Sequence, residues 1–212
     1  MTLEEKKEAL IQTEWEQFQK VQNEGGRASC QDDPETFFLQ RRSRLTAWTE
    51  EMVESWHLDL KAAEAAGRNL LAEKYAWMMK STAPEEFEKL KRLLRQPSPA
   101  GEQMIEELVK IQVAWMEEYK EQYPSLAAGN RAIHSSEDTP YTTSFETYSR
   151  GELSTYSEQT LHCYLEMVKK LQREGQNMAV LIMDATARAY GYADIDVAEA
   201  RERQRKENVI CK

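Results

Sequence analysis

The stretch AWTEEMVESWHLDLKAAEAAGRN, residues 47–69, carries the pattern that decides the fold. Its apolar side chains recur every three or four positions, the period of one helix face, at Val53, Trp56, Leu60 and Ala63. Gly67 suits the turn that ends a helix, and Asn69 is a good N-cap for a following helix over 70–80. The stretch therefore predicts a long amphipathic helix over about 47–66 and a sharp turn into a second helix.

The same periodicity extends over the rest of the chain. An amphipathic helix is expected over 3–22, ended by the glycine pair within 23–26. Another begins at Pro34 with Asp33 as its N-cap, and a further one runs from Pro84 to about 95. With only 8 Gly and 6 Pro in 212 residues, a turn-dense β-sandwich is disfavoured. We therefore expect an all-α fold.

The second half of the chain repeats the pattern 108 residues later, in TYSEQTLHCYLEMVKKLQREGQN at 155–177. A gapless comparison of 36–80 with 144–188 gives identities at Phe37, Arg42, Leu45, Glu50, Lys61, Gly67 and Asn69. Upstream, Ile11, Gln12 and Trp15 match Ile111, Gln112 and Trp115 at a shift of 100. Any two amphipathic helices share some identities because their compositions are similar. Gly and Asn at matching helix ends, in contrast, reflect the backbone geometry of those ends.

These matches predict one compact helical domain built from two similar, pseudo-symmetric halves. The internal repeat is expected to comprise 1–95 and 102–207, joined by the Pro-rich link 96–101. Two repeats are too few for a stable open solenoid, so the halves are expected to share one core about a pseudo-twofold axis.

Composition excludes several classes of protein. The chain has 28 Lys and Arg against 37 Asp and Glu, a net charge of −9, which argues against nucleic-acid binding. The charged N-terminus does not resemble a signal peptide, and no apolar run is long enough to span a membrane. Three widely spaced cysteines indicate neither a disulfide framework nor a metal knuckle. We expect a cytoplasmic protein.

Two polar loops at matched places in the halves are the candidate site. The first contains Arg27, Cys30 and Asp32, and the second contains Arg131, His134, Glu137 and Asp138. Paired arginines can bind one anionic group bidentately, and His134 would add an imidazole to the site. Arg42 and Arg150, also at matched positions, are expected to complete this site. The alternative is structural: Asp33 and Thr139 precede prolines as helix caps, and arginines often bind loop carbonyls.

Signals for catalysis, metals and cofactors are weak. There is no nucleophile elbow, and His134 with its neighbouring serines does not by itself form a triad. Glu54 and His57 form one E-x-x-H pair, too few for a di-iron site, so we expect no metal and no cofactor. Whether the protein is an enzyme stays open. Glu14 and Glu73 lie beside apolar helix residues, and buried ion pairs with Arg42 and Arg150 are expected for them.

Four stretches carry a resemblance to a known family. They are 14–33, 67–76, 133–141 and 143–156, including Gly25-Gly26-Arg27, His134-Ser135-Ser136 and Arg150-Gly151-Glu152. They resemble a bacterial family classified as domain of unknown function 4125. The resemblance implies a bacterial protein of this size, and it implies no catalytic residue.

Two functional hypotheses remain open. In the first, the protein binds or transforms a small anionic ligand held between Arg27 and Arg131. In the second, it is a helical interaction module without catalytic activity whose aromatic helices dock a protein partner or a second copy. The second hypothesis predicts an exposed apolar patch and no deep polar cleft.

Overall fold

The computed structural model describes residues 1–22 and 26–210, without the side chains of 209 and 210. The predicted helix break within 23–25 and Cys211 lie outside the described residues. In the described part the chain forms α-helices and short 3-10 turns and no β-strand, which confirms the all-α prediction. The helices are α1 (Leu3–Gln19), α2 (Pro34–Leu45), α3 (Glu50–Ala65), α4 (Leu70–Thr82), α5 (Pro84–Leu90), α6 (Pro99–Gln122), α7 (Pro124–Ala127), α8 (Phe145–Leu153), α9 (Glu158–Arg173), α10 (Met178–Ala189) and α11 (Ile195–Ile210).

The helix boundaries follow local capping chemistry. Asp33 accepts a hydrogen bond from Thr36 N at the start of α2, and Asn69 accepts one from Ala72 N at the start of α4, as predicted. Gly67 has a φ of 70°, the left-handed turn that a side chain would strain.

Within the predicted link 96–101, α6 begins at Pro99 with Ser98 as its N-cap. One predicted helix cap is wrong. Thr139 caps no helix: it pairs with Thr142 in an isolated β-bridge, and Ser144 is the N-cap of α8. A Thr-Pro pair fits a tight turn as well as a helix start, which is why the sequence misled here.

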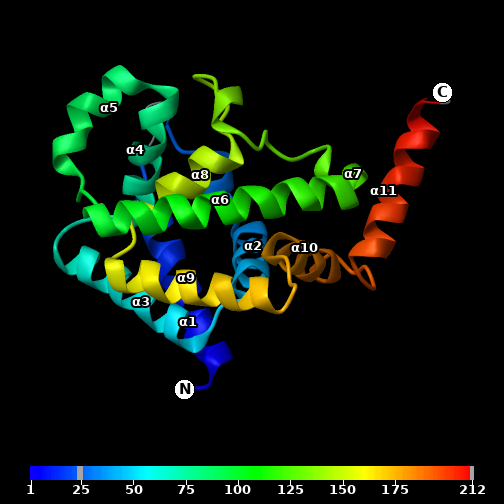
Figure 1. Cartoon of the computed structure of the whole chain (residues 1–212), viewed down its shortest axis with the longest axis horizontal. Coiled ribbons are helices and arrows are strands. Elements are labelled where there is room, and N and C mark those ends of the chain that lie inside the picture. The colour runs from blue at the N-terminus through cyan, green and yellow to red at the C-terminus, as the bar shows by residue number, and fades with distance from the viewer. Residues whose placement is uncertain (23–25, 211–212) are drawn as a thin grey trace.

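The helices pack around one main core. Figure 1 shows the long α6 crossing the molecule, with α9 and α3 below it and α11 projecting at the C-terminal end. The core side chains come from α1 to α4, α6 and α8 to α10, including Leu10, Ile11, Met52, Leu108 and Val168, each fully buried. A smaller cluster around Tyr119, Tyr123 and Ile195 joins α6 to α7, α10 and α11.

Several helices that lie 108 residues apart in the sequence make similar contacts. α3 and α9 both span 16 residues and begin 108 residues apart, and α4 and α10 also begin 108 residues apart. α2 packs on α10, and its counterpart α8 packs on α4. Asn69 Nδ2 donates to Gln17 O at 2.7 Å, and Asn177 Nδ2 donates to Trp115 O at 3.0 Å. Gln17 therefore corresponds to Trp115, so the first helix matches at a shift of 98 rather than the predicted 100.

Residues at corresponding positions meet where the halves join. Arg44 and Glu152, 108 residues apart, form an ion pair with each other. Two aromatic pairs that are each other's counterparts at the shift of 108 also meet there: the ring centres of Trp48 and Tyr164 lie 5.9 Å apart, and those of Trp56 and Tyr156 lie 4.3 Å apart. That the halves superpose by a half-turn, and that they arose by duplication, stays a prediction.

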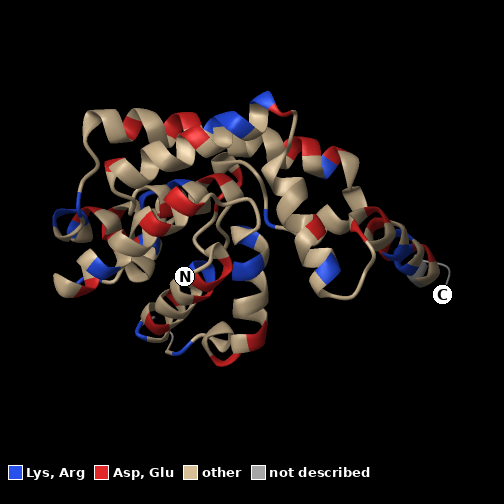
Figure 2. Ribbon diagram, turned by 90° about the horizontal axis from the view of Figure 1, so that it is seen from below, with Lys and Arg blue, Asp and Glu red and all other residues tan. Residues whose placement is uncertain are grey.

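Charges are spread over the outer helix faces. Figure 2 shows acidic and basic residues interspersed along the helices rather than gathered by sign. Among the described residues, no helix combines the length and the apolar character needed to cross a membrane.

Candidate functional site

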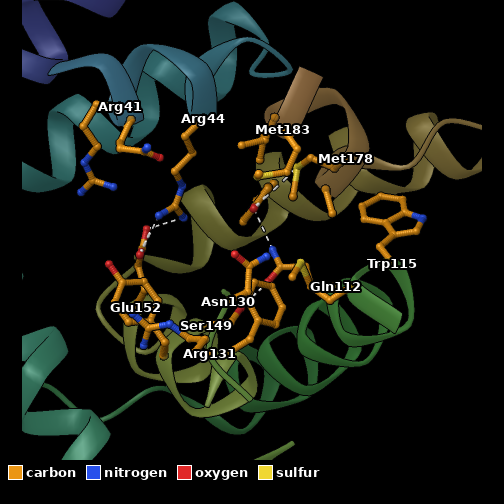
Figure 3. Close-up of a pocket in the computed structure, with 17 residues that line it drawn as sticks. Arg41, Arg44, Gln112, Trp115, Asn130, Arg131, Ser149, Glu152, Met178 and Met183 are labelled. Atoms are coloured by element: carbon orange, nitrogen blue, oxygen red, sulfur yellow. Dashed lines mark hydrogen bonds and ion pairs between the residues drawn. The ribbon is translucent and has the colours of Figure 1, made fainter. Parts of the chain in front are cut away.

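A cavity of about 390 Å³ lies among α2, α6, α8, α9 and α10 and is the candidate site. We call it the arginine cavity. Its polar lining consists of Gln40, Arg41, Arg44, Gln112, Asn130, Arg131, Ser149 and Glu152. Its apolar and aromatic lining consists of Trp115, Met116, Phe145, Tyr148, Tyr164, Met178, Ala179, Ile182 and Met183. Figure 3 shows Arg41 and Arg44 reaching in from α2, with Met178 and Met183 of α10 beside them.

Arg44 and Glu152 form the central ion pair of this site. Arg44 Nη1 donates to Glu152 Oε2 at 2.8 Å, and Arg44 Nη2 lies 2.5 Å from Glu152 Oε1. Tyr156 Oη donates to the same carboxylate at 3.0 Å. Burial would raise the pKa of Glu152, but the cations of Arg44, Lys74 and Arg41 outweigh it and hold the pKa at about 2. Glu152 is therefore a buried carboxylate that stays charged.

Arg41 belongs to a second buried pair. Its Nε lies 3.0 Å from Glu14 Oε2, and the other oxygen of Glu14 accepts a hydrogen bond from Trp56 Nε1 at 2.9 Å. Only 3% of the Glu14 side chain and 12% of the Arg41 side chain are exposed. Charges at such depth are kept only when they are paired. This pair connects α1, α2 and α3 directly behind the cavity wall.

Lys74 adds a third buried cation. Its Nζ donates to Tyr148 Oη at 2.7 Å and lies 4.4 Å from the centre of the Tyr148 ring. Burial would lower the pKa of Lys74, but Tyr148 and Glu152 outweigh it, so its pKa is raised. Burial would likewise raise the pKa of Tyr148, but Lys74 and the nearby arginines lower it. The ammonium is therefore charged beside a phenol that lines the arginine cavity.

Neutral side chains on the α6 side are already engaged with one another. Gln112 Nε2 donates to Tyr164 Oη at 2.7 Å, and Gln112 Oε1 accepts a hydrogen bond from Ser149 Oγ. These bonds fix the amide and leave little room for it to turn toward a ligand. Gln112 and Ser149 therefore shape the cavity rather than offer free donors.

Arg131 stands apart from the other two arginines. It is exposed, its guanidinium lies 4.7 Å from the centre of the Tyr148 ring, and Nη1 donates to Thr143 O at 3.1 Å. Within residues 1–22 and 26–210 no carboxylate lies within 4.0 Å of its guanidinium, unlike Arg41 and Arg44. Arg131 is therefore a cation at the rim of the cavity with donor capacity to spare.

Of the residues predicted for the site, only Arg131 lines this cavity. Arg27 lies in the other loop, where it pairs with Asp32 at 2.7 Å and donates to Gln31 O at 2.7 Å and to Gln19. Cys30 is exposed in the short turn Ser29–Asp32. The structure thus uses Arg27 and Asp32 to close their own loop.

The second loop is also internally bonded. His134 Nε2 lies 3.2 Å from Glu117 Oε1, and His134 N donates to Glu137 at 3.3 Å. Asp138 accepts hydrogen bonds from Ser144 N at 2.6 Å and from Thr147 Oγ1 at 2.5 Å, which ties the loop to α8. These bonds give His134, Glu137 and Asp138 a structural role, which was the alternative to a role in ligand binding.

Arg42 and Arg150 occupy equivalent places on the outside of the bundle. Arg42 pairs with Glu8 and Arg150 pairs with Glu106, and each lines a separate polar cavity of about 620 to 630 Å³. The predicted partners of the two buried glutamates are therefore wrong. Glu14 pairs with Arg41, next to the predicted Arg42, because in a helix adjacent residues face different directions. Glu73 pairs with its neighbour Arg68 at 2.5 Å.

Sequence reasoning missed Arg41, Arg44, Lys74 and Glu152. One signal was present: Arg44 and Glu152 occupy matched positions of the repeat with opposite charge. His57 bonds to Thr13 Oγ1 at 3.1 Å and Glu54 pairs with Lys6, so the E-x-x-H residues face different partners. The described residues contain no cluster of three or more His, Cys, Asp and Glu suited to a metal ion.

Comparison with known proteins gives one match. The family model described as a protein of unknown function, DUF4125, matches residues 4–200, which include every residue that lines the arginine cavity. No curated protein and no solved structure matches the chain significantly. The chain therefore belongs to the DUF4125 family, as its four signature stretches suggested.

Proposed function

We propose that this protein binds a small organic anion in the arginine cavity. The observation that carries the proposal is a mostly apolar cavity with three arginines and only one carboxylate in its lining, in a protein of net charge −9. Binding sites for small molecules are concave, largely apolar and provided with a few convergent polar groups. A surplus of positive charge in such a place favours an anionic ligand.

The proposal shifts the predicted ligand from a place between two loops to a place beside one of them. Arg131 keeps its predicted part, and Arg41 and Arg44 of α2 replace Arg27 as its partners. The competing hypothesis of an interaction module has less support. The large exposed apolar side chains in the described chain are few and scattered along the sequence, at Met1, Leu58, Leu93, Tyr141, Tyr190 and Val197.

Methionine methyl groups provide a site-specific test. Met116, Met178 and Met183 line the cavity, whereas the other six of the nine methionines do not. With the methyl groups labelled with carbon-13, titration with octanoate, octyl sulfate and octyl phosphate should shift the three cavity signals first. No shift with any of the three anions, or equal shifts at all nine methionines, would overturn the proposal.

A matched pair of variants tests the role of Arg131. Arg131→Ala should raise the dissociation constant of the tightest anion about tenfold or more, since a charge-assisted hydrogen bond contributes about 1.5–3 kcal/mol. Arg27→Ala is the control, because Arg27 is an exposed loop arginine of the other half that does not line the cavity. Equal effects of the two variants would show that the anion binds to surface charge and not in the cavity.

A further inference from the structure

The two halves differ in how they fill corresponding space. In the second half, Tyr164, Met178 and Ala179 line the arginine cavity. Their counterparts 108 residues earlier, Trp56, Leu70 and Leu71, line a remnant of only about 10 Å³. The side chain that occupies the first half is Lys74, whose counterpart is Ile182. Lys74 thus fills, in the first half, the space that stays open in the second half.

The charges around these two spaces differ. The ammonium of Lys74 and the carboxylate of Glu152 line the small remnant together. At the shift of 108 the counterpart of Glu152 is Arg44 and the counterpart of Lys74 is the apolar Ile182, and both line the arginine cavity. Lys74 therefore supplies a cation next to Glu152, whereas the corresponding position 182 supplies no anion next to Arg44.

A charge count around the cavity sets the charge of the missing anion. The buried network contains the cations Arg41, Arg44 and Lys74 and the carboxylates Glu14 and Glu152, so one positive charge is in excess. Arg131 is at the rim in contact with water, which screens its charge without a partner. A second negative charge on a ligand would face the ionised Glu152 in the wall. One negative charge balances the buried network.

The cavity walls and volume indicate the apolar character and the size of the rest of the ligand. Met178 and Met183 lie on the side away from Glu152 (Figure 3), and with Met116 and Ile182 they give the cavity an adaptable apolar surface. A water molecule takes up roughly 30 Å³ in the liquid, so about 390 Å³ holds about a dozen non-hydrogen atoms. A carboxylate matches the planar fork of a guanidinium and carries a single charge.

We infer that the ligand is a monocarboxylate with an apolar body, about ten to twelve non-hydrogen atoms in all, its carboxylate between the α2 arginines and Arg131 and its body against the α10 methionines. This inference rests on the proposed function and narrows its ligand class to medium-chain or aryl-substituted organic acids.

Calorimetric titration of the whole chain at pH 8 with four probes tests the inference. Octanoate carries one charge, octyl phosphate carries two, octan-1-ol carries none, and acetate lacks the body. Octanoate should bind at least tenfold more tightly than each of the other three, since the loss of one charged contact or of the apolar body each costs at least that factor. The methionine methyl signals should place bound octanoate against Met178 and Met183.

The outcomes separate the two proposals. Tighter binding of octyl phosphate than of octanoate would overturn the single charge while leaving anion binding in place. Equal binding of octan-1-ol and octanoate would overturn both. As a further arm, Ile182→Glu should supply the missing anion internally and raise the dissociation constant of octanoate at least tenfold, whereas Ile182→Met should leave it within about threefold. Undiminished binding to a folded Ile182→Glu protein would also overturn the inference.

Discussion

Removing the charge of Glu152 should destabilise this protein far more than removing the charge of a surface glutamate. Glu152→Gln keeps the shape of the side chain but leaves Arg44 and Lys74 without their shared carboxylate, and only 6% of the Glu152 side chain is exposed. Loss of one partner of a buried ion pair costs about 3–5 kcal/mol, because the remaining charge stays buried without compensation. Urea unfolding at pH 7, followed by far-ultraviolet circular dichroism, measures this loss.

The pH dependence of the same variant gives an independent magnitude. The folded pKa of Glu152 is about 2 and its ordinary value is 4.5, so its stabilising contribution is complete above about pH 4.5. That contribution is lost as the pH falls from 4.5 toward 2, and a shift of this size corresponds to about 3 kcal/mol. Between pH 5 and pH 2 the wild-type protein should therefore lose about 3 kcal/mol more free energy of unfolding than Glu152→Gln.

Two controls define the result that would refute this reasoning. Glu106→Gln removes a carboxylate that also pairs with an arginine, Arg150, but 60% of its side chain is exposed, so it should cost less than about 1 kcal/mol. Arg44→Met combined with Glu152→Gln should cost less than the sum of the single changes, by about 1 kcal/mol or more. A cost for Glu152→Gln no larger than that of Glu106→Gln, with parallel pH profiles, would show that the buried pair is not a stabilising centre.

Three further predictions concern close packing, helix capping and a buried charge. Gly151→Ala should cost about 1–3 kcal/mol, because a Cβ there would lie 2.7 Å from Met78 Cγ and 3.0 Å from Lys74 O, whereas Gly129→Ala, with open space around it, should cost little in the same unfolding assay. Asn177→Ala and Asn69→Ala should each cost about 2 kcal/mol, since each loses an N-cap and a hydrogen bond to the preceding long helix; unfolding costs below about 0.5 kcal/mol would contradict this. Lys74→Met should lower the free energy of unfolding by about 1–4 kcal/mol through loss of its bond to Tyr148 and its charge beside Glu152, and an unchanged urea midpoint would contradict that role.

The helices were predictable because their signals are local. These signals lie within a few residues of one another: the spacing of Val53, Trp56 and Leu60 marks the helix, and Gly67 and Asn69 mark its end and the next start. The register of the first helix was not predictable in this way. Matches of common residues such as Gln12 with Gln112 do not fix a register, whereas the hydrogen bonds that reach it from Asn69 and Asn177 do, and those bonds are formed only by folding.

Most residues of the candidate site could not be predicted from the sequence, for a related reason. Polar loops at matched positions of the two halves suggested a site, but Arg27 is paired with Asp32 only five residues away. Arg44, in contrast, looks like an ordinary helix-surface cation until α8 brings Glu152 against it from 108 residues further along the chain. Within one sequence, periodicity shows which face of a helix is apolar, but it does not show which distant helix covers a charged side chain at the edge of that face.

The position of this ion pair also bears on how the predicted duplication could have proceeded. In a symmetric dimer of identical halves, a residue that meets its own counterpart at the axis faces the same residue, so two arginines or two glutamates would meet. Like charges in contact destabilise a buried interface, and identical chains cannot carry Arg at one of these positions and Glu at the other. Arg44 opposite Glu152 therefore requires that the two halves differ in sequence, which separate copies in one chain allow. The same freedom lets position 74 be a lysine that closes its cavity while position 182 is an isoleucine that leaves the counterpart open.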